Sequence, residues 1–215
     1  MTAPRVERSV DPAMPESTRT IKGIEGLEDV PRSFIHVPYY SLVQPESSKA
    51  ILPDGKRSPN GSFLMTDVRK VVDELRFVIL RAKRQTRVLG GEKIVSLNVL
   101  GFNLERKTPF ILSVPVTSFS AFGRYFAHLQ EVGAKTTWEY IVDATPEEVS
   151  DKKQTDKGIR DVTWWVIRLD IEAVADDKLK ALAKELYEDY GEKLDRNDED
   201  DDLSAIAGKV FNNNK

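Results

Sequence analysis

Strand-length runs of apolar and β-branched residues follow one another through the middle of the chain. The five runs occupy residues 74–83, 94–102, 108–116, 136–142 and 161–169. Short apolar runs and imperfect apolar–polar alternation, separated by turn residues, are typical of strands. The pattern therefore predicts five successive strands, and it predicts that the polar residues 143–160 form a loop between the last two.

A helical pattern lies between the third and fourth of these strands. Phe122, Phe126 and Leu129 recur at helical spacing. Ser118 can cap this helix and Gly133 can end it. Five strands with one helix between the third and fourth is the element order of an OB-fold, a small Greek-key barrel. The sequence therefore predicts a mainly β chain, built on an OB-fold-like β-barrel.

The pattern changes on both sides of this predicted barrel. Residues 33–43 contain enough β-branched and aromatic residues for a further strand, and apolar residues from 175 to 187 predict an amphipathic helix that ends near Gly191. The like-charge block 195–202 (DRNDEDDD) is not expected to fold alone. We divide the chain into a flexible N-terminal arm (1–30), an OB-like domain (31–171), a C-terminal helix (172–192) and a disordered acidic tail (193–215).

Charge is distributed unevenly along the chain, although the net charge is only −3. Residues 76–135 hold ten Lys or Arg and three Asp or Glu, whereas residues 172–202 hold five and thirteen. A positive region attracts polyanions, and a negative tail can occupy the same groove weakly or recruit another protein. The alternative for the tail is a segment that only promotes solubility.

Several classes of protein are disfavoured by what the sequence lacks. There is no cysteine, which excludes a disulfide framework, a thiol nucleophile and cysteine-ligated metal, and which fits a reducing compartment. No apolar run approaches the roughly 20 residues that span a bilayer, and residues 1–10 do not form a secretory signal. We expect no membrane partner and a cytoplasmic location.

The search for catalytic motifs gives no candidate. His36 and His128 are the only histidines, and neither belongs to a metal-binding spacing such as HExxH. No phosphate-binding loop or dinucleotide fingerprint is present, and the acidic block lacks the glycine of a calcium loop. We therefore expect no enzyme, no metal site and no cofactor; a nuclease with a metal site hidden in the fold is the open alternative.

Five cations, offset only by Glu92, surround the turn between the first two predicted barrel strands. They are Arg81, Lys83, Arg84, Arg87 and Lys93. Long cationic side chains on a hairpin can follow a phosphate backbone, and each neutralised phosphate contributes through counterion release. The alternative is a solvated sheet edge, because lysines also protect edges from aggregation.

Aromatic residues near the last two predicted strands are candidates for stacking on bases. They are Trp138, Tyr140, Trp164 and Trp165. Bases stack on exposed rings with little dependence on sequence. Trp164 and Trp165 are adjacent, so their side chains point to opposite faces of a strand. The alternative is that both are packed, one inside the barrel and one beneath the C-terminal helix.

Three stretches carry a resemblance to a known family. They are VQPESSKAILPDGKRSPNGSFL (43–64), ELRFVILRAKRQTRV (74–88) and PFILSVPVTSFSAFGRYFAHL (109–129). Over residues 33–169 the chain resembles the OB-fold single-stranded DNA-binding proteins of tailed bacteriophages, and its acidic block resembles the tails of replicative single-strand binders. The resemblance implies a role in DNA replication or recombination, with replication or recombination proteins as partners of the acidic tail.

The combined prediction is a sequence-tolerant single-stranded DNA-binding protein that holds the backbone with Lys and Arg and stacks bases on aromatic rings. The sequence does not distinguish DNA from RNA, and it leaves open whether the chain forms a homo-oligomer. The alternative function is a phage structural or protein-interaction module without nucleic-acid binding, in which the arm and the tail are docking segments.

Overall fold

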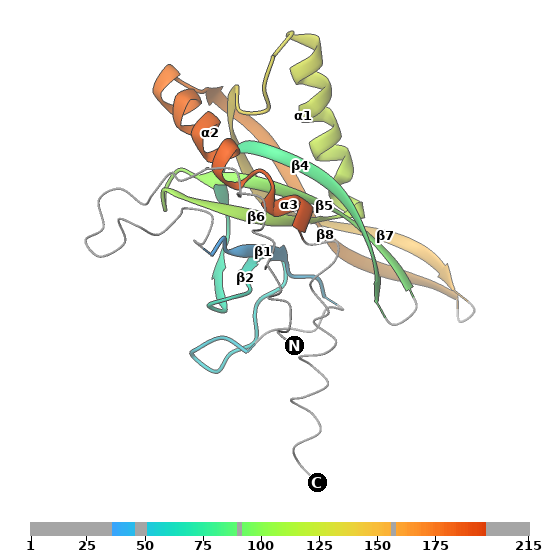
Figure 1. Ribbon diagram of the computed structural model, residues 1–215. Coiled ribbons are helices and arrows are strands. Elements are labelled where there is room, and N and C mark those ends of the chain that lie inside the picture. Colours follow the sequence, from blue (N-terminus) through green and yellow to red (C-terminus); the bar gives the residue numbers. More distant parts are fainter. Residues whose placement is uncertain (1–35, 46–50, 90–91, 156–157, 197–215) are drawn as a thin grey trace, which may run out of the picture. The chain divides into compact units, whose positions relative to one another are not determined.

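A computed structural model describes residues 36–45, 51–89, 92–155 and 158–196 (Figure 1). The predicted N-terminal arm and the acidic residues 198–202 lie outside the described residues. The strands are β1 (Tyr39–Leu42), β2 (Phe63–Met65), β3 (Lys70–Val72), β4 (Leu75–Leu89), β5 (Glu92–Asn103), β6 (Thr108–Pro115), β7 (Tyr140–Thr155) and β8 (Gly158–Val174). The helices are α1 (Phe119–Glu131), α2 (Asp177–Tyr190) and the short α3 (Lys193–Arg196), and a 3₁₀ turn at Val116–Ser118 precedes α1.

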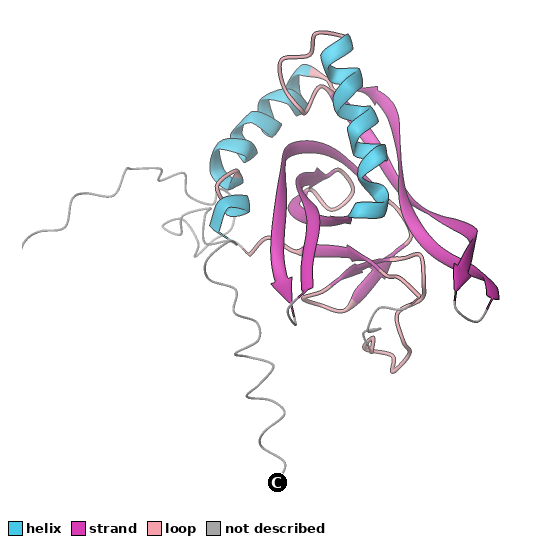
Figure 2. Ribbon diagram, turned by 90° about the vertical axis from the view of Figure 1, so that its right-hand side faces the viewer, coloured by secondary structure: helices cyan, strands magenta, loops and turns pink. Residues whose placement is uncertain are grey.

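The strands form one eight-stranded sheet in the order β3-β2-β1-β6-β5-β4-β7-β8. Neighbouring strands are antiparallel except β1 and β6, which pair in parallel. The sheet curves into a half-barrel (Figure 2). The outer half of the β7–β8 hairpin projects away from the other strands in both views.

The prediction of a five-stranded OB-fold barrel is wrong, although a mainly β chain is compatible with the structure. A closed barrel has no edge strands, whereas β3 and β8 are the two edges of this sheet among the described residues. The outer side of β6 is occupied by β1, whose residues Tyr39–Ser41 lie beside Ile111–Ser113. The last strand therefore ends the sheet as an edge.

A side chain bridges β8 and the chain just after β1, where no ladder forms. The Gln44 side-chain amide donates to the Trp165 carbonyl at 2.7 Å and accepts from the Trp165 N–H at 2.9 Å. These two bonds copy one step of a strand pairing, so they satisfy the main chain of β8 on the edge that faces away from its neighbour β7.

Two local predictions are also corrected. Residues 143–160 are not a loop, because β7 and β8 run on to Thr155 and Gly158 as one long hairpin. Ser118 does not cap α1 with its side chain; its hydroxyl instead accepts the Ile167 N–H at 2.8 Å, which ties the start of α1 to β8. The predicted end of α1 is confirmed, since Gly133 follows the helix with φ +68°.

The main core lies between the curved sheet and α1. Phe110 packs edge-on against Tyr40 and Phe77, with ring centroids 5.3 and 5.1 Å apart. Phe122 and Leu129 enter this cluster from α1. The apolar spacing predicted for the helix is therefore the spacing of its buried face.

Candidate functional site

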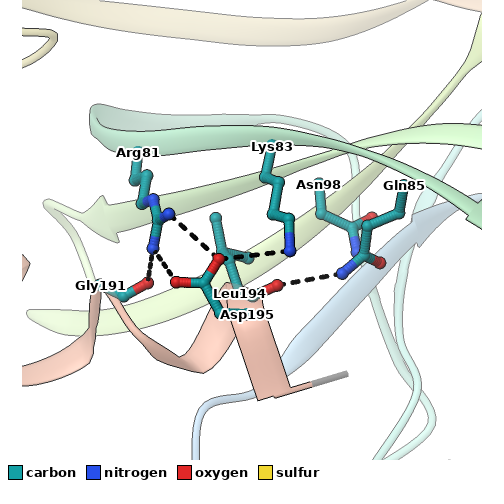
Figure 3. Close-up of polar contacts among 7 residues, drawn as sticks. All are labelled: Arg81, Lys83, Gln85, Asn98, Gly191, Leu194 and Asp195. Carbon is teal, nitrogen blue, oxygen red and sulfur yellow. Dashed lines mark hydrogen bonds and ion pairs between the residues drawn. The ribbon is translucent and has the colours of Figure 1, made fainter. Parts of the chain in front are cut away.

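Arg81 and Lys83 leave β4 on the face that meets α3, and both hold the carboxylate of Asp195 (Figure 3). The two terminal nitrogens of Arg81 lie 2.6 and 3.1 Å from the two Asp195 oxygens, and Lys83 Nζ lies 3.2 Å from Oδ1. Arg81 also donates to the Gly191 carbonyl at 2.6 Å. The hydrogen bonds from Arg81 and Lys83 hold the pKa of Asp195 below its usual value, and the same carboxylate raises the pKa of Arg81.

Buried polar contacts hold α3 in this place. Gln85, next on the same face of β4, donates to the Leu194 carbonyl at 3.1 Å and accepts from Asn98 of β5. Asn98 in turn accepts the Tyr39 hydroxyl at 3.1 Å. Gln85, Asn98 and Leu194 are all buried. The turn that presents Asp195 is therefore anchored through its main chain and through one apolar side chain.

A pocket of about 480 Å³ lies beside this ion cluster, between β4, α1, the α1–β7 loop and α2. Three rings line it: Phe126 from α1, Trp138 from the loop and Tyr187 from α2. Arg81 and Lys135 line it as well. The pocket thus brings together a predicted cation and a predicted ring, Arg81 and Trp138.

The loop that carries Trp138 is held in place through the residues on both sides of Trp138, Thr137 and Glu139. The Thr137 hydroxyl donates to the Leu80 carbonyl at 2.8 Å, and the Tyr125 hydroxyl donates to the Thr137 carbonyl at 2.7 Å. Glu139 pairs with Lys180 of α2 at 2.6 Å, and the hydrogen bond from Lys180 lowers the pKa of Glu139. These bonds link the loop to β4, α1 and α2.

The other predicted rings lie elsewhere. Trp165 packs against the core and covers the backbone at Gly61, where an added Cβ would overlap its indole. Trp164, one residue earlier in β8, points to the opposite face and is half-buried. Tyr140 packs against the core and the His128 ring, whose centroid lies 5.3 Å away. These three rings do not line the pocket that holds Trp138.

The remaining predicted cations are split from Arg81 and Lys83 by strand alternation. Arg84 is exposed on the other face of β4, and the pairing of β4 with β5 places the exposed Lys93 on that face too. Lys93 lines a second pocket of about 460 Å³, which β1, β5 and β6 form. The Arg87 side chain lies outside the described residues. The five predicted cations therefore do not form one cluster.

Tyr187, Lys135 and Asp195 belong to the site but were not predicted from the sequence. Tyr187 was assigned to the apolar face of a helix, and Asp195 to the acidic tail. The only available signal for Asp195 was the general expectation that an acidic segment can occupy a cationic groove.

The described residues contain neither a metal-binding cluster nor a helix that could cross a membrane. That part of the chain holds no group of three or more His, Asp or Glu side chains arranged to bind a metal ion. His36 lies 2.8 Å from Asp67 in an exposed pair. Within the same residues, no helix has both the length and the apolar character needed to cross a membrane.

Comparisons with protein-family models, with curated proteins and with solved structures find no match to this chain.

Proposed function

We propose that the chain binds single-stranded DNA with little dependence on sequence and acts in DNA replication or recombination. One observation carries the proposal: Arg81 takes part in an anion-binding cluster and also lines a pocket walled by aromatic rings. Every nucleotide of a single strand carries the two groups that such a site can bind, a phosphate for the cations and a base for the rings.

The anion-binding half of the site has the chemistry of a phosphate site. A guanidinium fork binds carboxylate and phosphate in the same two-pronged manner, and a lysine adds a point charge. Arg81 and Lys83 supply this set of donors around Asp195. Asp195 thus marks where an anionic group is held, and an incoming phosphate would compete with it.

The ring-lined half supplies contacts that every base can use. Stacking on an aromatic side chain contributes about 1–3 kcal/mol per base and tolerates any sequence. Trp138 is only half-buried, and Tyr187 is 39% exposed. The site therefore favours unpaired bases, because the bases of a duplex are stacked on each other and are not accessible to these rings.

A titration of the full chain with oligothymidine, at low and at moderate salt, tests the proposal. We expect a change in tryptophan emission and a mobility shift at low salt, with affinity that falls steeply as salt rises. A duplex of equal length is the control and should bind more weakly. Unchanged emission together with no shift at low salt would rule the proposal out.

The exposed edge of the sheet favours a second candidate, a protein-interaction module. Ile159, Ile171 and Val174 of β8 are large apolar residues that are 69%, 41% and 65% exposed. An edge strand with such side chains can pair with a strand of another protein. Co-sedimentation with a protein assembly, without oligonucleotide binding, would favour this candidate.

A further inference from the structure

The pocket beside Arg81 has the size and the walls of a site for one planar group. Its volume of about 480 Å³ lies within the range of small-molecule sites, about 300–1,000 Å³. The rings of Trp138 and Tyr187 are already in contact, with centroids 5.3 Å apart and planes tilted by 40°. They therefore form one continuous wall, and Phe126 lines the same pocket from α1.

The pocket is formed before any ligand arrives. Thr137 is bonded to Leu80 of β4, and Tyr125 of α1 is bonded to Thr137, so the main chain next to Trp138 is held from two sides. The Glu139–Lys180 pair joins the same loop to the helix that carries Tyr187. A preformed wall binds a ring without first having to order its own side chains.

Three cations in and beside the pocket are placed near the phosphate that would be attached to such a ring. Arg81 lines the pocket and reaches Asp195 with its guanidinium group. Lys83 contacts the same carboxylate, and Lys135 lines the pocket from the α1–β7 loop. A ligand with a planar ring and an adjacent anion, which is the chemistry of a nucleotide, matches this arrangement.

We propose that this pocket takes one unstacked base of the bound strand, and that the phosphate of the same nucleotide replaces the Asp195 carboxylate at Arg81 and Lys83. This inference rests on the proposed function and makes it specific. Tyr187 and Lys135 become contact residues of the strand. Tyr187 belongs to α2 and Asp195 to α3. The bound nucleotide would therefore contact α2 through its base and displace a side chain of α3 with its phosphate.

Photocrosslinking locates the base directly. The full chain is irradiated with an oligothymidine that contains one 5-iododeoxyuridine, and the crosslinked peptide is identified by mass spectrometry. We expect crosslinks on the peptides that carry Trp138 or Tyr187. Crosslinks confined to other peptides, such as the one that carries Trp164, would overturn the pocket assignment while the strand-binding function stands.

Matched substitutions give an independent readout. Trp138→Phe should abolish most of the emission change on binding, whereas Trp164→Phe should keep it. Tyr187→Ala should weaken oligothymidine binding about 5- to 150-fold, the loss expected for one stacked base, and Tyr187→Phe should bind almost normally. Equal affinity of Tyr187→Ala and the natural chain would overturn the assignment. If Tyr187→Ala does not fold, the tryptophan pair and the crosslink decide. A natural chain that binds no oligonucleotide would refute this inference and the proposed function together.

Discussion

The carboxylate of Asp195 lies 2.6 and 3.1 Å from the two terminal nitrogens of Arg81, a residue 114 positions earlier in the chain. Asp195 opens the acidic block of the sequence, and Arg81 opens the basic stretch. The basic stretch and the start of the acidic block thus contact each other through this ion pair, and Lys83 also binds the Asp195 carboxylate.

Removing the charge of Asp195 should strengthen oligonucleotide binding. In Asp195→Asn the phosphate no longer competes with a tethered carboxylate, so we expect the affinity for oligothymidine at low salt to rise several-fold. Asp161→Asn, an equal charge change at an exposed position of β8, is the control and should alter affinity much less. Equal effects of the two substitutions would mean that only net charge matters and that Asp195 does not occupy the phosphate position.

The pair between Glu139 and Lys180 should make stability depend on pH in the acidic range. The hydrogen bond from Lys180 lowers the pKa of Glu139, so the folded state holds the proton less tightly than the unfolded state does. The resulting stabilisation is complete above the unfolded pKa of about 4.3 and is lost as the pH falls through the lower folded pKa. Urea unfolding should show Lys180→Met less stable than the natural chain at pH 7, with the difference vanishing at low pH. A difference that persists at low pH would show that the loss comes from packing.

Two glycines with similar backbone angles should respond differently to alanine. Gly61 and Gly133 have φ of +65° and +68°, but an added Cβ would overlap the Trp165 ring only at Gly61. Gly133→Ala should show the conformational cost alone, and Gly61→Ala should lose about 1–3 kcal/mol more through overpacking. Urea unfolding of both variants measures the difference. Equal losses would mean that Trp165 shifts freely away from the glycine.

Replacing Gln85 should loosen α3 and destabilise the chain. Gln85→Leu removes the donor to the buried Leu194 carbonyl and the acceptor for Asn98. An unsatisfied buried polar group costs about 1–3 kcal/mol, so the free energy of unfolding should fall by at least that amount. Gln154→Leu, at an exposed position of β7, is the control for the change in residue type. A Gln85 variant as stable as this control would contradict the anchoring role of the buried contacts.

The sequence predicted the elements whose signal is local. β4, β5 and β6 bury short runs of consecutive apolar residues, and α1 buries one apolar face, so their residues carry the pattern of the structure they form. The outer β7–β8 hairpin was missed because its residues, such as Glu148 and Lys153, are exposed and have no core to cover. Polar strands without a buried face lack the alternation on which such predictions depend.

The order of the strands and the composition of the site could not be predicted, because both depend on contacts between residues far apart in the sequence. Nothing near Tyr39 indicates that it pairs in parallel with a strand some 70 residues later, and this pairing is what takes the outer side of β6. Arg81 and Trp138 were predicted as binding residues, and they share a pocket because β4 and the α1–β7 loop meet. Tyr187 joins them only because α2 returns over the sheet, which residue types alone do not indicate.

The salt dependence of oligothymidine binding tests the central claim most directly. For the natural chain, the logarithm of the binding constant should fall linearly with the logarithm of salt concentration, with a slope of about −0.7 for each phosphate held. Lys83→Gln should make the slope shallower by about 0.7, whereas Lys153→Gln, on the exposed β7–β8 hairpin, should leave it unchanged. A natural chain that does not bind at low salt, or one whose slope is the same with and without Lys83, would contradict the account.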